Sequence, residues 1–386
     1  MQRIEVMEIS KIFKSEYDID WNYVMSFQEF QALENCQHSI RWHKEGNPLN
    51  HTKLVVDEAI KLCKGYPYHA QCDPKVLITA ALFHDIGKPS TTYWSNEKND
   101  WKCKSHGAAG ELITRELLWN ESIVLREEIC WLVRWHMEFH HFLEKSSEEQ
   151  GRKMMRLGNG ISSVFYLLML NYCDSVGSVC EGNDTETIKA RLEKIKELAI
   201  NFDCLEHNIK PENFKYDFEV IFMVGLPGSG KDTYIKNHYP DYPTVCRDDV
   251  REELQNGKVE GKKLLFDNEG ENKVTEICNG LIEKYCKEHK SFVINQTNLK
   301  RKYRQEIGKL IYAHSLPWIK YVYVEAPSID TCIERRKGQI EPSIIRNMFD
   351  KFEFPDCDEC NELIIAKGSD KAFEWKEETY PKYTTK

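Results

Sequence analysis

The sequence predicts an all-α domain followed by an α/β domain with a parallel sheet. Three observations lead to this division. Residues 48–202 carry long apolar patterns of helical period, residues 205–216 are polar and contain a proline, and later apolar runs alternate with helical patterns. We therefore expect a helical domain over residues 1–204, a linker over 205–216 and an α/β domain over 217–386.

The composition predicts a globular chain with no membrane segment. The 386 residues are 41% hydrophobic and 30% charged, and the longest uncharged apolar stretch, residues 161–173, is too short to span a bilayer. Charges occupy the N-terminus where a signal peptide needs an apolar core, so we expect a cytoplasmic protein. The net charge of −9 argues against general nonspecific nucleic-acid binding, although a local basic groove stays compatible with it.

The helical half embeds imidazoles and carboxylates in apolar helices. The run Val76–Phe83 ends in HDIGKP, where Gly87 and Pro89 stop the helix. A carboxylate such as Asp174, after the run VFYLLMLNYC, is costly to bury unless something binds it. A single histidine on such a helix is usually a hydrogen-bonded core residue, but several together predict a metal site. The candidate ligands are His51, His84, Asp85, His106, His136 and Asp174.

The order H…HD…D resembles the HD phosphohydrolase superfamily. Residues 42–52, HDIGKP, Ser105 to Gly107 and His136-Met137 resemble the HD domain of bacterial CCA-adding enzymes, over about residues 25–200. The resemblance implies one metal on His51, His84, Asp85 and Asp174, and a second held with His106 and His136. Two transition-metal ions (Mn, Co, Ni, Fe or Zn) suit these donors better than Ca or Mg.

Other residues near this motif have open roles. Lys88 lies one turn after His84 and could contact a phosphate, or it could be an exposed lysine. His43 is expected to act as an acid or a phosphate contact. His69, His140 and His141 match no motif, so we expect them on the surface.

The second half opens with a phosphate-binding loop. The apolar run 218–224 predicts a buried strand, and a helical pattern follows the loop. The expected nucleotide-binding residues are Gly225, Leu226, Pro227, Gly228, Ser229, Gly230, Lys231, Asp232 and Thr233. Asp232 stands where this loop usually has the serine or threonine that binds Mg²⁺, so the choice between Asp232 and Thr233 as the magnesium contact stays open.

Three further segments resemble P-loop kinases of polynucleotide 5′ ends. Arg247-Asp248-Asp249-Val250-Arg251 follows an expected strand over 244–246, and the resemblance implies that Asp248 activates the acceptor hydroxyl while Arg251 grips the adjoining phosphate. The alternative is a helix cap with an Asp248–Arg251 ion pair.

The strand expected over 292–295 ends in Asn295-Gln296-Thr297-Asn298, which resembles a D-x-T-N strand end without its acidic residue. Asn298 is then expected to contact the substrate, and a basic patch follows in Lys300, Arg301, Lys302 and Arg304. Residues 330–338 resemble the kinase lid, in which Arg335 or Arg336 contacts the transferring phosphate. Further strands are expected at 319–324 and 363–366.

The combined halves resemble the bifunctional HD–polynucleotide-kinase end-healing enzymes. The resemblance implies 5′ phosphorylation with ATP or another NTP and Mg²⁺, and metal-dependent removal of 2′,3′-cyclic or 3′/2′ phosphates. Its substrates would be RNA or DNA strand ends, with a separate ligase as a possible partner. The alternative is an HD nucleotidase or cyclic-nucleotide phosphodiesterase fused to a small-molecule kinase. A third reading is that one module is a non-catalytic sensor.

Overall fold

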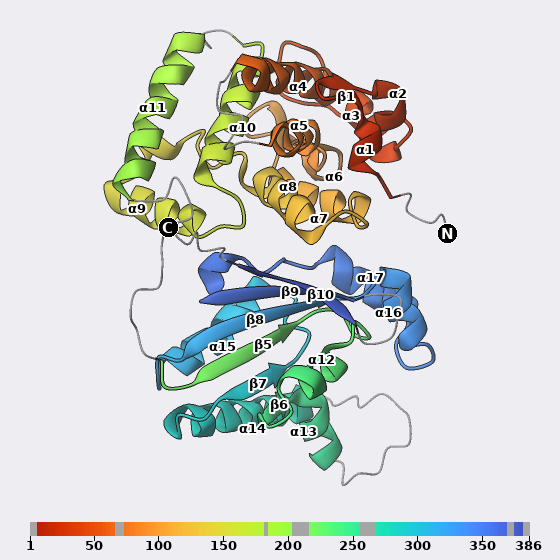
Figure 1. Ribbon diagram of the computed structural model, residues 1–386, viewed down its shortest axis with the longest axis vertical. Helices are drawn as coiled ribbons and strands as arrows, with labels where there is room; N and C mark the ends of the chain where they lie inside the picture. Colours follow the sequence, from red (N-terminus) through yellow and green to blue (C-terminus); the bar gives the residue numbers. More distant parts are fainter. Residues whose placement is uncertain are drawn as a thin grey trace. The chain divides into compact units, whose positions relative to one another are not determined.

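The computed structural model describes residues 6–65, 73–180, 184–202, 216–254, 268–368 and 374–380 (Figure 1). The chain divides into two compact units, residues 1–209 with 383–386, and residues 210–382. Apart from Tyr216, the expected linker lies outside the described residues, and so does His69. Across the described ranges, every helix is too short or too polar to cross a bilayer.

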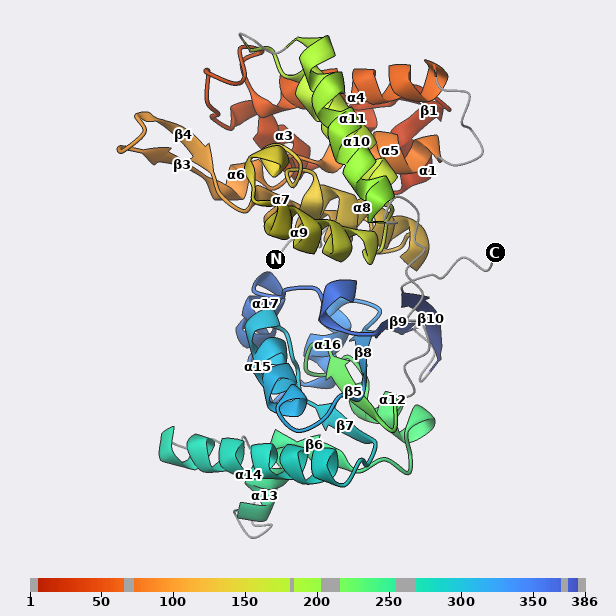
Figure 2. The ribbon, with the colours of Figure 1, turned by 90° about the vertical axis from the view of Figure 1, so that its left-hand side faces the viewer.

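The first unit is helical, as predicted. Its helices are α1 (Ile9–Ile12), α2 (Trp21–Val24), α3 (Gln28–Asn35), α4 (Pro48–Gly65), α5 (Pro74–Phe83), α6 (Lys88–Thr91), α7 (His106–Leu117), α8 (Ile123–Trp135), η1 (Phe142–Glu144), α9 (Ser147–Gly158), α10 (Val164–Gly177) and α11 (Thr185–Asn201). Two antiparallel hairpins, which the sequence analysis did not predict, pair β1 (Phe13–Ser15) with β2 (Asp18–Ile19) and β3 (Thr92–Ser95) with β4 (Asp100–Cys103). Figure 2 shows β3 and β4 extending from the helices.

Helix α5 is the centre of this unit. It packs against α4, α8 and α10, and every residue of Val76–Phe83 is buried. An apolar helix covered on all sides carries whatever follows it into the interior, so His84 and Asp85 lie inside the unit. Gly87 allows the next segment to approach α7, because a Cβ there would lie 2.1 Å from the carbonyl oxygen of His106.

The second unit is an α/β layer built on one six-stranded sheet. Its strands are β5 (Glu219–Val224), β6 (Thr244–Cys246), β7 (Phe292–Asn295), β8 (Trp318–Glu325), β9 (Glu362–Gly368) and β10 (Trp375–Tyr380). The helices are α12 (Lys231–His238), α13 (Arg247–Leu254), α14 (Asn268–Lys287), α15 (Arg301–Tyr312), α16 (Ile329–Arg335), α17 (Pro342–Asp350) and η2 (Cys357–Glu359). The spatial order is β10-β9-β8-β5-β7-β6, parallel except for β10. The parallel sheet confirms the predicted fold class.

The sheet brings three motifs to one edge. Helices α12 and α15 lie on opposite faces of it (Figures 1 and 2), so the inner strands are buried on both sides. In register, Asn295 at the end of β7 pairs with Met223 of β5 and Cys246 of β6. The carboxyl ends of parallel strands therefore place the phosphate loop, the start of α13 and Asn295 side by side.

Candidate active sites

The first unit gathers its six candidate metal ligands from the ends of five helices. His51 lies in the first turn of α4, His84 and Asp85 follow α5, and His106 begins α7. His136 directly follows α8, and Asp174 lies near the end of α10. All six side chains are buried. Residues separated by more than 120 positions thus converge on one interior point.

The six residues form two groups of three. The donor atoms of His51, His84 and Asp174 lie within 4.8 Å of one another, and those of Asp85, His106 and His136 do the same. Asp85 joins the groups, because its Oδ2 lies 3.3 Å from Nε2 of His84 while its Oδ1 lies 3.5 Å from Nε2 of His106. Asp85 therefore faces both groups, as a bridging carboxylate must.

The backbone sets the orientation of two imidazoles. Nδ1 of His84 lies 2.7 Å from the carbonyl oxygen of Ala81, and Nδ1 of His136 lies 2.7 Å from that of Val133. Since a carbonyl only accepts, each Nδ1 carries the proton and each Nε2 presents a lone pair. The Nε2 of His84 then faces Asp85 at 3.3 Å, lone pair toward carboxylate, an arrangement that a cation between them would satisfy.

The charges of the site also suit metal binding. Burial lowers the pKa of His106 to about 4 and that of His136 to about 3, so both imidazoles are neutral near pH 7, the form that ligates metals. Burial by itself raises the pKa of Asp85, but the Lys88 ammonium and His84 outweigh it and hold that pKa well below its usual range. Four imidazoles and two carboxylates fit transition-metal ions better than Ca²⁺ or Mg²⁺.

The structure also places the residues of open role. Lys88 is buried and its Nζ lies 2.6 Å from Oδ2 of Asp85, so the exposed-lysine alternative is wrong. His43 is near the ligands: its Nδ1 lies 2.8 Å from Oε1 of Glu45, and its ring centroid lies 4.7 Å from that of His51.

Two functional residues were missed by sequence reasoning. Glu45 reaches His51 as well as His43, at 3.0 Å from Nδ1 of His51. His140 was expected on the surface, but it is partly buried and its Nε2 lies 3.0 Å from Oδ2 of Asp174. Its position four residues after His136 was the available signal. His141 is exposed beside Glu144.

In the second unit the phosphate loop follows β5 directly. Gly225, Gly228 and Gly230 have φ values of +148°, +84° and +110°, the region that favours glycine. A Cβ at Gly225 would lie 2.6 Å from the carbonyl oxygen of Val324, so the loop packs closely on β8. Nζ of Lys231 donates to the carbonyl oxygens of Gly225 and Leu226, at 3.0 and 2.9 Å, and burial lowers its pKa to about 8.

A cavity of about 1350 Å³ lies over this loop. Residues Pro227 to Thr233 line it, together with the start of α13 and both lid arginines. Nη1 of Arg335 donates to the carbonyl oxygen of Gly228 at 3.1 Å, and Nη2 of Arg336 lies 3.9 Å from Oδ2 of Asp232. The lid and the loop thus face the same space.

The start of α13 carries the expected base and clamp into that cavity. The Asp248 side chain is 82% exposed, and its Oδ1 accepts from Nη1 of Arg251. Arg251 also donates to both carboxylate oxygens of Glu271, at 2.8 and 2.9 Å, and Glu271 accepts from Arg247 as well. The i,i+3 ion pair of the alternative interpretation is therefore present. Glu271, on α14, was missed by the sequence analysis.

The motif after β7 differs from its expected role. Asn298 is buried, and its Nδ2 donates to the carbonyl oxygen of Met223 at 2.8 Å, which joins the motif to β5 instead of presenting it to a substrate. The expected basic patch is wrong in part. Arg304 is fully buried, with a bidentate pair to Glu359, and Arg301 pairs with Asp358.

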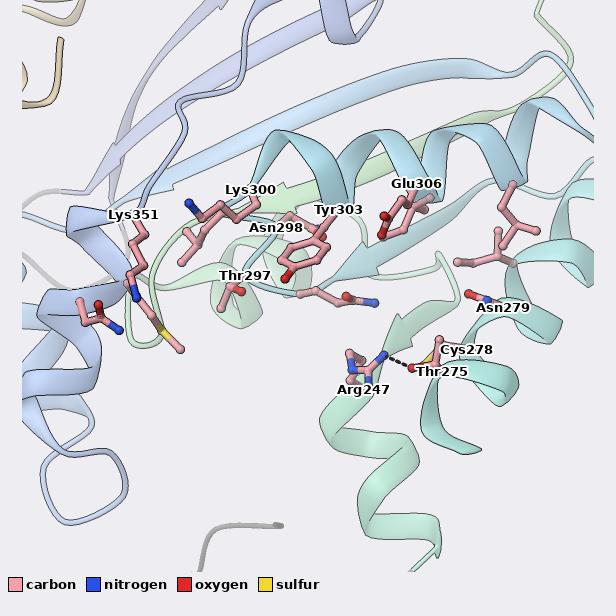
Figure 3. Close-up of a pocket in the computed structure, with 17 residues that line it drawn as sticks. Arg247, Thr275, Cys278, Asn279, Thr297, Asn298, Lys300, Tyr303, Glu306 and Lys351 are labelled. Atoms are coloured by element: carbon pink, nitrogen blue, oxygen red, sulfur yellow. Dashed lines mark hydrogen bonds between the residues drawn. The ribbon is translucent and has the colours of Figure 1, made fainter. Parts of the chain in front are cut away.

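A second cavity of about 660 Å³ lies between α14, α15 and α17 (Figure 3). Tyr303, an aromatic side chain 57% exposed, lines it together with Lys300 and Lys351. Arg247 faces it from the start of α13, where its Nη1 donates to the Thr275 hydroxyl at 2.9 Å. The two cavities share part of their lining: Arg247, Gln296, Thr297 and Met348.

Comparisons with known proteins match both halves. Residues 49–157 match the family described as the HD domain, and residues 220–351 match a family described as an AAA domain. No curated protein matches the sequence of this chain.

Similar solved structures include a putative kinase from Chloroflexus aurantiacus, 15% identical over 37% of this chain and 81% of that chain, with a TM-score of 0.30. A chain of the Pnkp1/Rnl/Hen1 complex is 19% identical over 34% of this chain and 43% of that one, with a TM-score of 0.28. A gluconokinase from Sinorhizobium meliloti is 15% identical over 40% and 84%, with a TM-score of 0.26.

Proposed function

We propose that this chain, which joins an HD domain to a P-loop kinase-like domain, is a nucleic-acid end-healing enzyme. The two domains are those of a phosphohydrolase and a kinase. In the proposal, the kinase phosphorylates 5′-hydroxyl ends of RNA or DNA with an NTP, and the HD domain hydrolyses 2′,3′-cyclic or 3′/2′ phosphates. Both substrates can be ends of one broken strand.

The HD residues support metal-dependent phosphate hydrolysis. His51, His84 and Asp174 would hold one ion, and His106 and His136 a second, with Asp85 between the groups. Such ions lower the pKa of a bound water and neutralise charge on the attacking and leaving oxygens. Lys88, drawn into the interior by Asp85, and His43 are the protein's own groups for orienting a phosphate and moving a proton.

The kinase residues support phosphoryl transfer to an alcohol. Backbone N–H groups of the loop and the Lys231 ammonium can bind nucleotide phosphates, and Arg335 lies against the same loop. The exposed carboxylate of Asp248 lines the nucleotide cavity, where it can accept the proton of an acceptor hydroxyl.

The observation that carries the polynucleotide acceptor is the second cavity. It meets the nucleotide cavity at Arg247, and its lining combines an exposed aromatic ring, Tyr303, with the ammonium groups of Lys300 and Lys351. Stacking surfaces beside cations are the features that bind single strands, because every base has a π face and every nucleotide a phosphate. The cavity therefore suits the 5′-terminal nucleotides of a strand.

A kinase for a small metabolite is the second candidate, and one observation favours it. Arg251, the expected clamp for an adjoining phosphate, already pairs with Asp248 and with both oxygens of Glu271. An acceptor without that phosphate would leave these ion pairs intact. A strand must exchange them for its own phosphate.

One substrate tests both halves of the proposal. A strand with a 5′-hydroxyl and a 2′,3′-cyclic phosphate is incubated with the protein, with and without ATP. We expect metal-dependent opening or loss of the cyclic phosphate in both cases, and 5′ phosphorylation only with ATP. Faster transfer to nucleosides or sugars than to the strand would refute the polynucleotide acceptor.

Variants of Tyr303 connect that outcome to the second cavity. Base–aromatic stacking contributes about 1–3 kcal/mol, so Tyr303→Ala should raise KM for a 5′-hydroxyl strand by roughly 5- to 150-fold. The matched control, Tyr303→Phe, keeps the ring and should keep KM.

A further inference from the structure

Two departures from the usual phosphate-loop pattern meet in this structure. Asp232 follows Lys231 where the loop usually has a hydroxyl, and Asn295 ends β7 where the strand-end motif has an acid. Each looks like the loss of a magnesium ligand when taken alone. In the fold, Nδ2 of Asn295 donates to Oδ1 of Asp232 at 2.7 Å.

The contact follows from the topology. Strands β5 and β7 are parallel neighbours, with Met223 opposite Asn295 at their carboxyl ends. The loop after β5 turns back into α12, whose second residue is Asp232. Loop position and strand end therefore face each other across the nucleotide cavity, which both residues line.

We propose that the two positions have exchanged chemistry, so that Asp232 is the carboxylate that holds the divalent cation of the kinase and Asn295 positions it. The proposal rests on the proposed kinase function and identifies the cation-binding residues of that same site. The number of carboxylates at the site is unchanged; only the element that carries the carboxylate differs.

The residues fit a hard cation. The Asp232 side chain is 64% exposed toward the cavity, while Asn295 fixes its Oδ1. Carboxylate and amide oxygens are the donors that Mg²⁺ and Mn²⁺ accept. The competing interpretation is that Asp232 anchors the lid through Arg336, whose Nη2 lies 3.9 Å away, beyond hydrogen-bond distance.

The exchange has a consequence that a hydroxyl would not have. A carboxylate beside Lys231 repels nucleotide phosphates unless a cation neutralises it. Asp232 should therefore make nucleotide binding depend on the cation. The enzyme would reject metal-free nucleotide at the binding step and not only during transfer.

The test measures binding without turnover. The affinity for a non-hydrolysable ATP analogue is determined with Mg²⁺ and with EDTA, for the full chain and for Asp232→Ser, Asn295→Asp and the double variant. We expect the Mg²⁺ preference of Asp232→Ser to fall by at least about tenfold, chiefly because metal-free binding improves. The double variant should recover the preference, because a carboxylate then stands at the strand end.

Two further measurements keep the proposal open to refutation. Electron paramagnetic resonance of Mn²⁺ should show weaker binding to the nucleotide complex of Asp232→Ser, and Asp232→Asn replaces it if that variant does not fold. An unchanged Mg²⁺ preference in both, or an equal loss in Arg336→Gln, overturns the proposal in favour of a lid anchor. Binding needs no acceptor, so a failure of the polynucleotide function alone would leave these results intact.

Discussion

Lys231 should take up a proton when a nucleotide binds. Burial lowers the pKa of its ammonium from 10.5 to about 8, and its only acceptors among the described residues are the neutral carbonyl oxygens of Gly225 and Leu226. Phosphate oxygens beside the ammonium favour its charged form, so binding must raise that pKa. A raised pKa in the complex means that protons enter with the nucleotide.

The size of the uptake follows from the two pKa values. If the phosphates restore the ordinary value, binding takes up about a tenth of a proton at pH 7, about half at pH 8 and about nine tenths at pH 9. The affinity is then fully developed below pH 8. It should fall by about tenfold for each unit between pH 8 and 10.

Calorimetry of nucleotide binding in two buffers with different ionisation enthalpies gives the uptake directly. The matched control is Lys231→Arg, whose guanidinium stays charged throughout this range, so its binding heat should be the same in both buffers. A wild-type heat at pH 8 that does not depend on the buffer would refute the reasoning. So would an equal uptake in the arginine variant.

Three other predictions follow from the described contacts. Lys231→Ala should abolish 5′ phosphorylation and spare phosphate release, and Asp85→Ala should do the reverse; loss of both activities in one folded variant contradicts separate sites. Arg304→Met should lower the unfolding free energy of the second unit by about 3–5 kcal/mol in denaturant titrations, because it leaves the buried Glu359 carboxylate unpaired. Elemental analysis should find two metal ions per chain and one in His106→Ala, and one ion in both proteins would exclude a binuclear site.

Much of the fold was readable from local pattern. The run FEVIFMV has no polar alternation, which identifies a strand buried on both faces, and the glycines after it identify the loop. Strand β10 was missed because its sequence, WKEETY, is mostly polar. As an edge strand it pairs only with β9, so it needs little apolar surface.

The metal ligands were accessible because each stands out against an apolar helix. Their partners were not. Glu45 lies in a polar segment where a glutamate carries no signal, and only the packing of α4 brings it to His51. Arg304 looked like part of a basic patch because its partner, Glu359, is 55 positions away in the chain. Charge pairing at such separations is a property of the tertiary structure.

The two helix-end histidines have a consequence for how this centre can change. His84 and His136 are held by carbonyl oxygens three residues earlier, one from each helix end. Other metal centres often use a carboxylate for this purpose, which a single codon change can remove. Here the orienting group belongs to the main chain, so substitution of the neighbouring side chains leaves it in place. Only a change of chain length, such as one residue inserted into the last turn of α5, would rotate the imidazole by about 100° and disable it.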